Sequence, residues 1–325
     1  MTTFFKRASV AVAACALILA GCATQPEPPR MAGRSPAQPP IARIETPEPA
    51  GLVAQASVFE AFMRHARRID PAFGGPSDVA QALQTGASHE PHELEAGMIA
   101  YAALAALQEP RFVAAARTGG SDLARRIAAD PQAALILPGA DAAEARARGA
   151  LYAEGAALSG EGEKVKHAAY AIQRQAWAKA KVPDAAGRLS RVKRLSTETY
   201  QPAREDPAEL QMSLAGAARR GGAASPVVAR GVALAALSAL GEARQGRSLM
   251  SEPRTTSCLH MAKLNLYQCL ASAGPNYEDV YCLGQHAMID PGQCVVEATQ
   301  ARQAMGPQIR SRSQATRGAS AGGMG

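Results

Sequence analysis

The chain has 325 residues, a formal net charge of +7 and an aromatic content of only 4%. The charge is uneven, because residues 51–297 contain 26 basic and 25 acidic side chains, whereas the residues after them contain four arginines and no acid. A nearly neutral central part argues against a nucleic-acid-binding protein. Abundant alanine and few β-branched runs favour closely packed helices over a sheet, so the composition predicts an all-α fold.

The first 21 residues have the layout of a secretory signal. Lys6 and Arg7 precede an apolar run over 8–20 that is too short to span a membrane, and the run ends in Leu19-Ala20-Gly21-Cys22. This tetrapeptide resembles the lipobox of bacterial lipoproteins. The resemblance implies that residues 1–21 are removed as a signal peptide and that Cys22 carries acyl chains such as palmitate, which anchor the protein to a membrane. An ordinary signal peptide with a chance cysteine is the alternative.

The residues that follow indicate where the anchored protein resides. In bacterial lipoproteins an aspartate after the acylated cysteine favours the inner membrane, and Ala23 occupies that place here. The resemblance therefore implies the outer membrane, with the protein facing the periplasm. Residues 22–50 contain eight prolines and no apolar periodicity, which predicts a disordered, semi-extended tether between the membrane and a folded domain.

Residues 51–250 are expected to form an all-α domain. Apolar residues recur at helical spacing over 58–69, and an acidic residue followed by proline, a pattern typical of helix starts, recurs at 70–71, 90–91, 109–110 and 130–131. Further helices are expected at about 92–108, 121–129, 141–158, 163–181, 184–197, 208–220 and 226–244. The even spacing would suit a stacked helical array, but an irregular multi-helix bundle is the favoured interpretation because no convincing sequence repeat accompanies it.

Four cysteines cluster near the end of the chain and are expected to form disulfides, because an exported protein folds in an oxidising compartment. They are Cys258, Cys269, Cys282 and Cys294. The first two are eleven residues apart and so share a helical face, and Gly274-Pro275-Asn276 predicts a turn into a second helix over 277–288. In an antiparallel hairpin the pairs would be Cys269–Cys282 and Cys258–Cys294.

The predicted hairpin over 251–297 resembles the twin-cysteine helical hairpins, with the difference that Pro291 is expected to end its second helix early. Zinc binding with His260 and His286 is the alternative, but the cysteines lack the close pairs typical of zinc ligation. We therefore expect no metal and no cofactor. Residues 298–325 are rich in Gln, Arg, Ser, Gly and Ala and are expected to form a disordered basic tail.

Two segments carry candidate chemistry. In His89-Glu90-Pro91-His92-Glu93-Leu94-Glu95, the carboxylates of Glu93 and Glu95 could act on a glycosidic bond, although acids in the first turn of a helix also stabilise it without any ligand. Residues 164–194 are strongly basic and could bind an anionic partner, although a solvated face is the simpler interpretation. The candidate binding residues there are Arg174, Lys181, Arg188, Arg191 and Arg194.

No nucleophile elbow, P-loop or dinucleotide-binding fingerprint occurs in the sequence, and no catalytic residue is predicted. The leading hypothesis is a lipid-anchored, periplasm-facing protein that acts as a non-catalytic helical scaffold or adaptor for another envelope protein. A peptidoglycan-acting enzyme is one alternative. The other is a lipid- or glycan-binding module that uses the basic face of 164–194. No nucleic-acid partner is expected.

Overall fold

The computed structural model describes residues 49–301. The predictions for the signal peptide, for Cys22 and Ala23, for nearly all of the tether and for most of the basic tail lie outside the described residues.

The described part of the chain is all-α, with one isolated bridge between Lys181 and Pro275 and no strand. None of its helices is both long and apolar enough to cross a bilayer. The α-helices are α1 (Pro49–Arg67), α2 (Pro76–Ala87), α3 (Pro91–Ala106), α4 (Pro110–Arg117), α5 (Gly120–Ala129), α6 (Ala140–Ile172), α7 (Ala176–Lys179), α8 (Ala185–Leu195), α9 (Asp206–Ala215), α10 (Pro226–Ala239), α11 (Pro253–Ser272), α12 (Asn276–Cys282) and α13 (Asp290–Ala298). Short 3₁₀ segments cover Pro131–Ala134 (η1) and Ala243–Leu249 (η2), and a π-helical segment covers Leu283–Ile289 (η3).

These helices form an irregular bundle around α3, whose residues from Gly97 to Ala106 are all buried. α3 packs against α1, α6, α10 and α11. Small residues allow this crowding, because a Cβ at Gly97 would lie 2.7 Å from the carbonyl oxygen of Gln55 in α1, and one at Gly231 would lie 2.6 Å from the Cβ of Ala102. The alanine-rich composition is therefore what permits close helix packing.

Acid–proline or serine–proline pairs begin several of the helices, and those at 90–91, 109–110 and 130–131 do so as the sequence predicts. Glu90 accepts a hydrogen bond from the backbone nitrogen of Glu93 at the start of α3, and Ser225 accepts one from Val228 at the start of α10. Asp70-Pro71 is the exception. There the Asp70 carboxylate accepts the amide of Ala72 in a turn, and the next helix begins only at Pro76.

The expectation of two helices at 141–158 and 163–181 is wrong, because α6 runs unbroken through both for 33 residues and ends at Ile172. The glycines in this part of α6 allow close packing. A Cβ at Gly162 would lie 2.8 Å from the Cβ of Met288, and one at Gly155 would lie 2.7 Å from the carbonyl oxygen of Gly292. Contact with η3 and α13 along its length outweighs the weak helix propensity of these positions.

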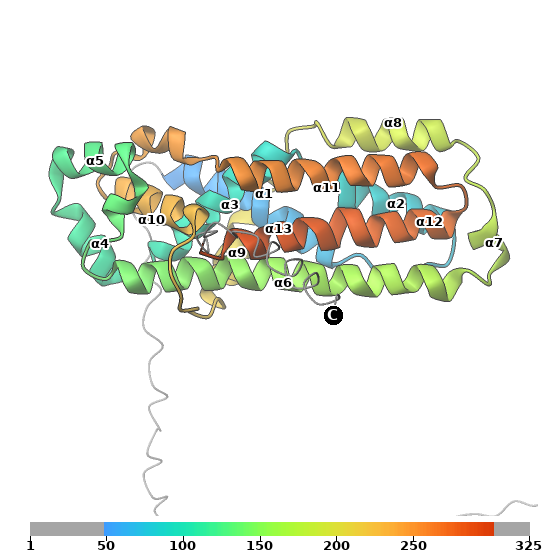
Figure 1. The fold of residues 1–325 in the computed structure, drawn as a ribbon, viewed down its shortest axis with the longest axis horizontal. Coiled ribbons are helices and arrows are strands. Elements are labelled where there is room, and N and C mark those ends of the chain that lie inside the picture. The colour runs from blue at the N-terminus through green and yellow to red at the C-terminus, as the bar shows by residue number, and fades with distance from the viewer. Residues whose placement is uncertain (1–48, 302–325) are drawn as a thin grey trace, which may run out of the picture. The chain divides into compact units, whose positions relative to one another are not determined.

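The predicted hairpin and both of its disulfides are confirmed. Cys258–Cys294 and Cys269–Cys282 join α11 to the return arm, with Cα–Cα distances of 5.7 and 5.6 Å. In Figure 1, α11 lies between α8 and the return arm formed by α12, η3 and α13, and α6 runs along the other side of that arm.

The prediction that Pro291 ends the return arm early is wrong, because the arm continues to Ala298 with Pro291 in the first turn of α13. Proline lacks an amide hydrogen and its ring clashes with the carbonyl four residues earlier in a regular α-helix. The π-helical segment η3 directly before α13 widens the helix, so the helical arm continues through Pro291.

Candidate functional site: a charged cleft over α1, α6 and α9

A cleft of about 460 Å³ lies over α1, α6 and α9, and we call it the charged cleft. The residues that line it are Glu60, Arg64, Arg67, Arg68, Tyr101, Ala150, Ala153, Glu154, Glu209, Met212, Ser213, Gly216 and Ala217. Glu60, Arg64 and Arg67 are four and three residues apart along α1, so they project from one side of that helix. The apolar residues Phe59 and Met63 of the same helix are buried in the core.

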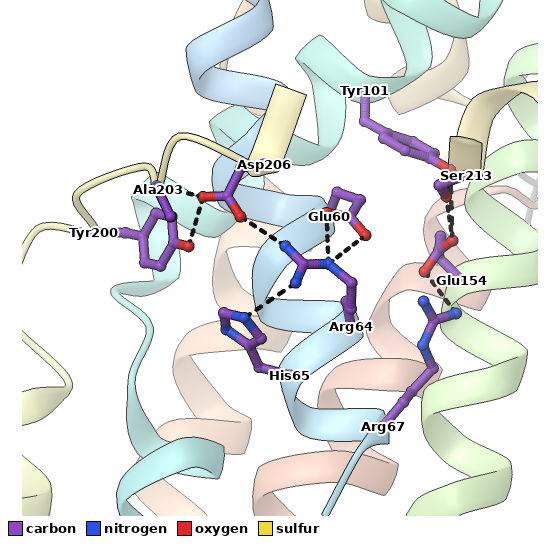
Figure 2. Close-up of polar contacts among 10 residues, drawn as sticks. All are labelled: Glu60, Arg64, His65, Arg67, Tyr101, Glu154, Tyr200, Ala203, Asp206 and Ser213. Carbon is purple, nitrogen blue, oxygen red and sulfur yellow. Dashed lines mark hydrogen bonds and ion pairs between the residues drawn. The ribbon is translucent and has the colours of Figure 1, made fainter. Parts of the chain in front are cut away.

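Arg64 is the centre of the first cluster in this cleft (Figure 2). Its Nε donates to both carboxylate oxygens of Glu60 at 3.0 and 3.2 Å, and its Nη2 donates to Oδ1 of Asp206 at 2.6 Å. The other oxygen of Asp206 accepts the hydroxyl of Tyr200 at 2.8 Å and the amide of Ala203 at 2.6 Å. A buried carboxylate with this many donors holds α9 firmly against α1.

Glu154 of α6 is the centre of the second cluster. Its Oε1 accepts the hydroxyl of Ser213 at 2.8 Å, and that hydroxyl lies 2.7 Å from the hydroxyl of Tyr101. Nη1 of Arg67 lies 2.8 Å from the other oxygen, Oε2. We call the buried polar side chains of these two clusters the floor of the cleft. Figure 2 shows the two clusters facing each other.

The floor contains three largely buried carboxylates and two arginines, and burial together with the neighbouring charges shifts the pKa values of its side chains. Burial raises the pKa of Glu60; Arg64 opposes this, and the nearby charge of Glu154 adds to it. Burial lowers the pKa of Arg64, but the carboxylates of Glu60 and Asp206 outweigh burial and raise it overall. Burial and then Glu154 also raise the pKa of Tyr101, which keeps its hydroxyl protonated. In Glu60, therefore, the neighbouring arginine does not fully offset the effect of burial on the pKa.

His65 contacts the same arginine from outside the floor, with its Nε2 3.2 Å from Nη1 of Arg64. Partial burial and the charge of Arg64 lower the pKa of this histidine. Because a guanidinium cannot accept a hydrogen bond, Nε2 accepts and the ring is neutral.

The rim of the cleft differs from its floor. Arg68 is exposed and Glu209 is half-buried, and neither has an ion-pair partner within residues 49–301. Met212, which also lines the cleft, is 62% exposed although it is a large apolar side chain. The rim thus offers one cation, one anion and an apolar contact to a partner.

The two glutamates nominated from the sequence do not line this cleft. Glu95 is completely buried, and its carboxylate accepts the amide of Glu252 and the hydroxyls of Ser251 and Thr256 at the start of α11. It is a structural cap and has no access to a substrate. Glu93 accepts the amide of Tyr200 at 3.1 Å, and burial raises its pKa.

The histidines of that segment do not form a metal site. Within the described residues no three metal-ligating side chains gather closely enough to hold an ion. His89 is buried against Phe62, and its Nδ1 lies 3.2 Å from Nζ of Lys263, which also donates to the carbonyl of Ala87 at 3.0 Å. Burial lowers the pKa of both Lys263 and His89, and the charge of Lys263 lowers that of His89 further.

The predicted basic stripe over 164–194 does not form as one surface. Arg188 is buried, where it binds Asp279 and the backbone carbonyl of Leu270, because the side of α8 that carries it packs on α11. Its assignment to an exposed binding face is wrong. The other four candidates, Arg174, Lys181, Arg191 and Arg194, are exposed but lie on different elements, before α7, after α7 and on α8.

Sequence reasoning missed the charged cleft, because the arginines of α1 look like the solvated side of an amphipathic helix. A signal was present in Glu60, which stands four residues before Arg64 among the apolar positions of that helix. Comparison with family models, with curated proteins and with solved structures finds no match to this chain.

Proposed function

We propose that this chain is a lipid-anchored envelope protein, held at the outer membrane by an acylated Cys22, whose helical domain acts as a non-catalytic adaptor. The charged cleft binds a segment of another envelope protein. The Pro-rich tether places that cleft in the periplasm, away from the membrane surface.

One observation carries this proposal: the acids of the cleft floor are already engaged. Both oxygens of Glu60 accept from Arg64, and both oxygens of Glu154 have polar partners. A general acid or base must exchange its proton with a substrate, whereas carboxylates held in this way order the floor. The exposed rim is left to make contacts, and methionine and arginine are enriched in protein interfaces.

The experiment is site-specific photocrosslinking in living cells. A photoreactive amino acid at Met212, on the rim, should give a discrete crosslinked species that the additional substitution Arg68→Glu removes. Met261 of α11 is the matched control, since it is 51% exposed and lies outside the cleft. Equal crosslinking at both positions, or a species at Met212 that Arg68→Glu leaves unchanged, would contradict the adaptor proposal.

A peptidoglycan-acting enzyme is the second candidate, and one observation favours it. Burial raises the pKa of Glu60, as expected of a general acid, and the same cleft holds a second carboxylate, that of Glu154. Zymography on purified peptidoglycan tests it, with Glu60→Gln compared with Glu163→Gln on the exposed side of α6. If Glu60→Gln alone loses the ability to clear peptidoglycan, the result would contradict the adaptor proposal and support the enzyme.

A further inference from the structure

A second hollow, of about 300 Å³, lies where α6 meets the loop after α9 and the end of α13, and we call it the loop hollow. Arg148 and Tyr152 of α6, Arg220 and Gly222 of the loop, and Thr299 contribute to its lining. None of them lines the charged cleft, so this hollow is independent of the function proposed above.

Arg148 brings an unused donor to this hollow. The residue is only 4% exposed. Its Nη2 pairs with Glu144 and its Nη1 donates to the carbonyl of Arg220 at 2.9 Å, but its Nε has no hydrogen-bond partner among the described residues. A buried, charged N–H without an acceptor is costly, and a bound anion would satisfy it.

Gly222 keeps the space beside that guanidinium open. Its φ of +136° is a conformation that favours glycine, and a Cβ there would lie 3.5 Å from Nη1 and 3.8 Å from Nε of Arg148. The loop is fixed on α6, because the amide of Arg220 donates to the carbonyl of Ala145 at 2.8 Å. The hollow is thus bounded by ordered backbone on one side and by a buried arginine on the other.

Arg220 supplies a second, exposed guanidinium. It stacks over the ring of Tyr152 with its Cζ 3.6 Å from the ring centre. Stacking uses the face of the guanidinium and leaves its N–H edge for an oxyanion. No carboxylate within residues 49–301 pairs with Arg220.

The local balance of charge is positive. Glu144 pairs with Arg148, while Glu109 is shared between Arg146 and Arg219. Together with Arg220, four arginines therefore face two carboxylates around this loop. Arginine N–H groups match the geometry of phosphate oxygens.

We propose that the loop hollow is a phosphate-binding site, in which Nε of Arg148 and the N–H edge of Arg220 donate to the phosphate oxygens. The phosphate belongs either to a free phosphate ion or to the headgroup of an anionic lipid. Both share the chemistry that the two arginines recognise.

The test is calorimetric titration of inorganic phosphate into the full chain in neutral-detergent micelles. Arg220→Ala should weaken binding about tenfold, as expected for loss of a charge-assisted contact. Arg219→Ala is the matched control, since it removes the same charge from the neighbouring residue, whose guanidinium is bound to Glu109. That control should bind phosphate within about twofold of the unsubstituted chain. Thermal melting of both variants verifies that they fold.

A second titration distinguishes the free phosphate ion from a lipid headgroup. Phosphatidic acid added to the micelles should displace free phosphate if the site takes a lipid headgroup, and should leave its binding unchanged if the site takes the free ion. Either result supports a phosphate site when Arg220→Ala weakens phosphate binding and Arg219→Ala does not. The proposal is overturned if phosphate shows no saturable binding, or if Arg219→Ala and Arg220→Ala weaken binding equally.

Discussion

Replacing Lys263 by methionine should remove a pH dependence of stability. The amine of Lys263 is buried, donates to the carbonyl of Ala87 and lies beside His89. Methionine has a similar length and no charge. The carbonyl of Ala87 still accepts the amide of His89 at 2.8 Å, with the hydroxyl of Ser196 at 3.1 Å, so Lys263→Met does not leave this buried carbonyl without a donor.

The size of the effect follows from proton linkage. Burial lowers the pKa of Lys263 well below its ordinary value, so the unfolded chain binds a proton that the folded chain does not. As the pH falls from the ordinary lysine pKa towards the depressed one, the free energy of unfolding falls by about 1.4 kcal/mol per pH unit. Above the ordinary lysine pKa both states are neutral and the slope disappears.

Urea denaturation of both chains between about pH 7.5 and 9.5, a window below the ordinary lysine pKa, measures this slope. The difference in the free energy of unfolding between Lys263→Met and the unsubstituted chain should shrink steadily as the pH rises. Groups common to both chains cancel in that difference. If the two pH profiles run parallel, the lysine is not neutral in the folded protein and the reasoning fails.

Three further predictions follow from the fold and the sequence. Mass spectrometry of the mature protein should find an acylated Cys22, and an unmodified N-terminus elsewhere would rule out the anchor. Replacing Cys269 and Cys282 together by alanine should lower the free energy of unfolding by about 2–4 kcal/mol, and an unchanged urea midpoint would contradict this. Asp206→Ala should lower the free energy of unfolding by about 3–5 kcal/mol, because Nη2 of the buried Arg64 and the hydroxyl of Tyr200 lose their acceptor. Asp122→Ala, at an exposed ion pair, should change the free energy of unfolding, measured in the same urea titration, by less than about 1 kcal/mol.

The features that the sequence predicts well depend on residues close together along the chain. A cap side chain before proline acts within one helical turn, so the start of α3 can be located from Glu90 and Pro91 alone. The disulfide pairing was also predictable, because two helices joined by a short turn leave their cysteines only one nested arrangement.

The features that could not be predicted from the sequence depend on contacts between residues far apart along the chain. Arg188 belongs to a basic segment, yet its partner Asp279 is 91 residues away and turns it inward. Glu95 looks like a free acid at a helix start, but α11 places its own first turn against it. The charged cleft arises in the same way, since Arg64 meets Asp206 only after α9 folds back on α1.

The nested disulfides give the end of the domain a particular resistance to proteolysis. The turn at Gly274-Pro275 lies inside both the Cys269–Cys282 and the Cys258–Cys294 loops. A protease that cuts this turn therefore releases no fragment, and the two arms stay joined by two covalent bonds. α11 also keeps its packing on α8, and the return arm keeps its packing on α6. A molecule nicked at this turn should therefore stay covalently joined and folded until it meets a reductant.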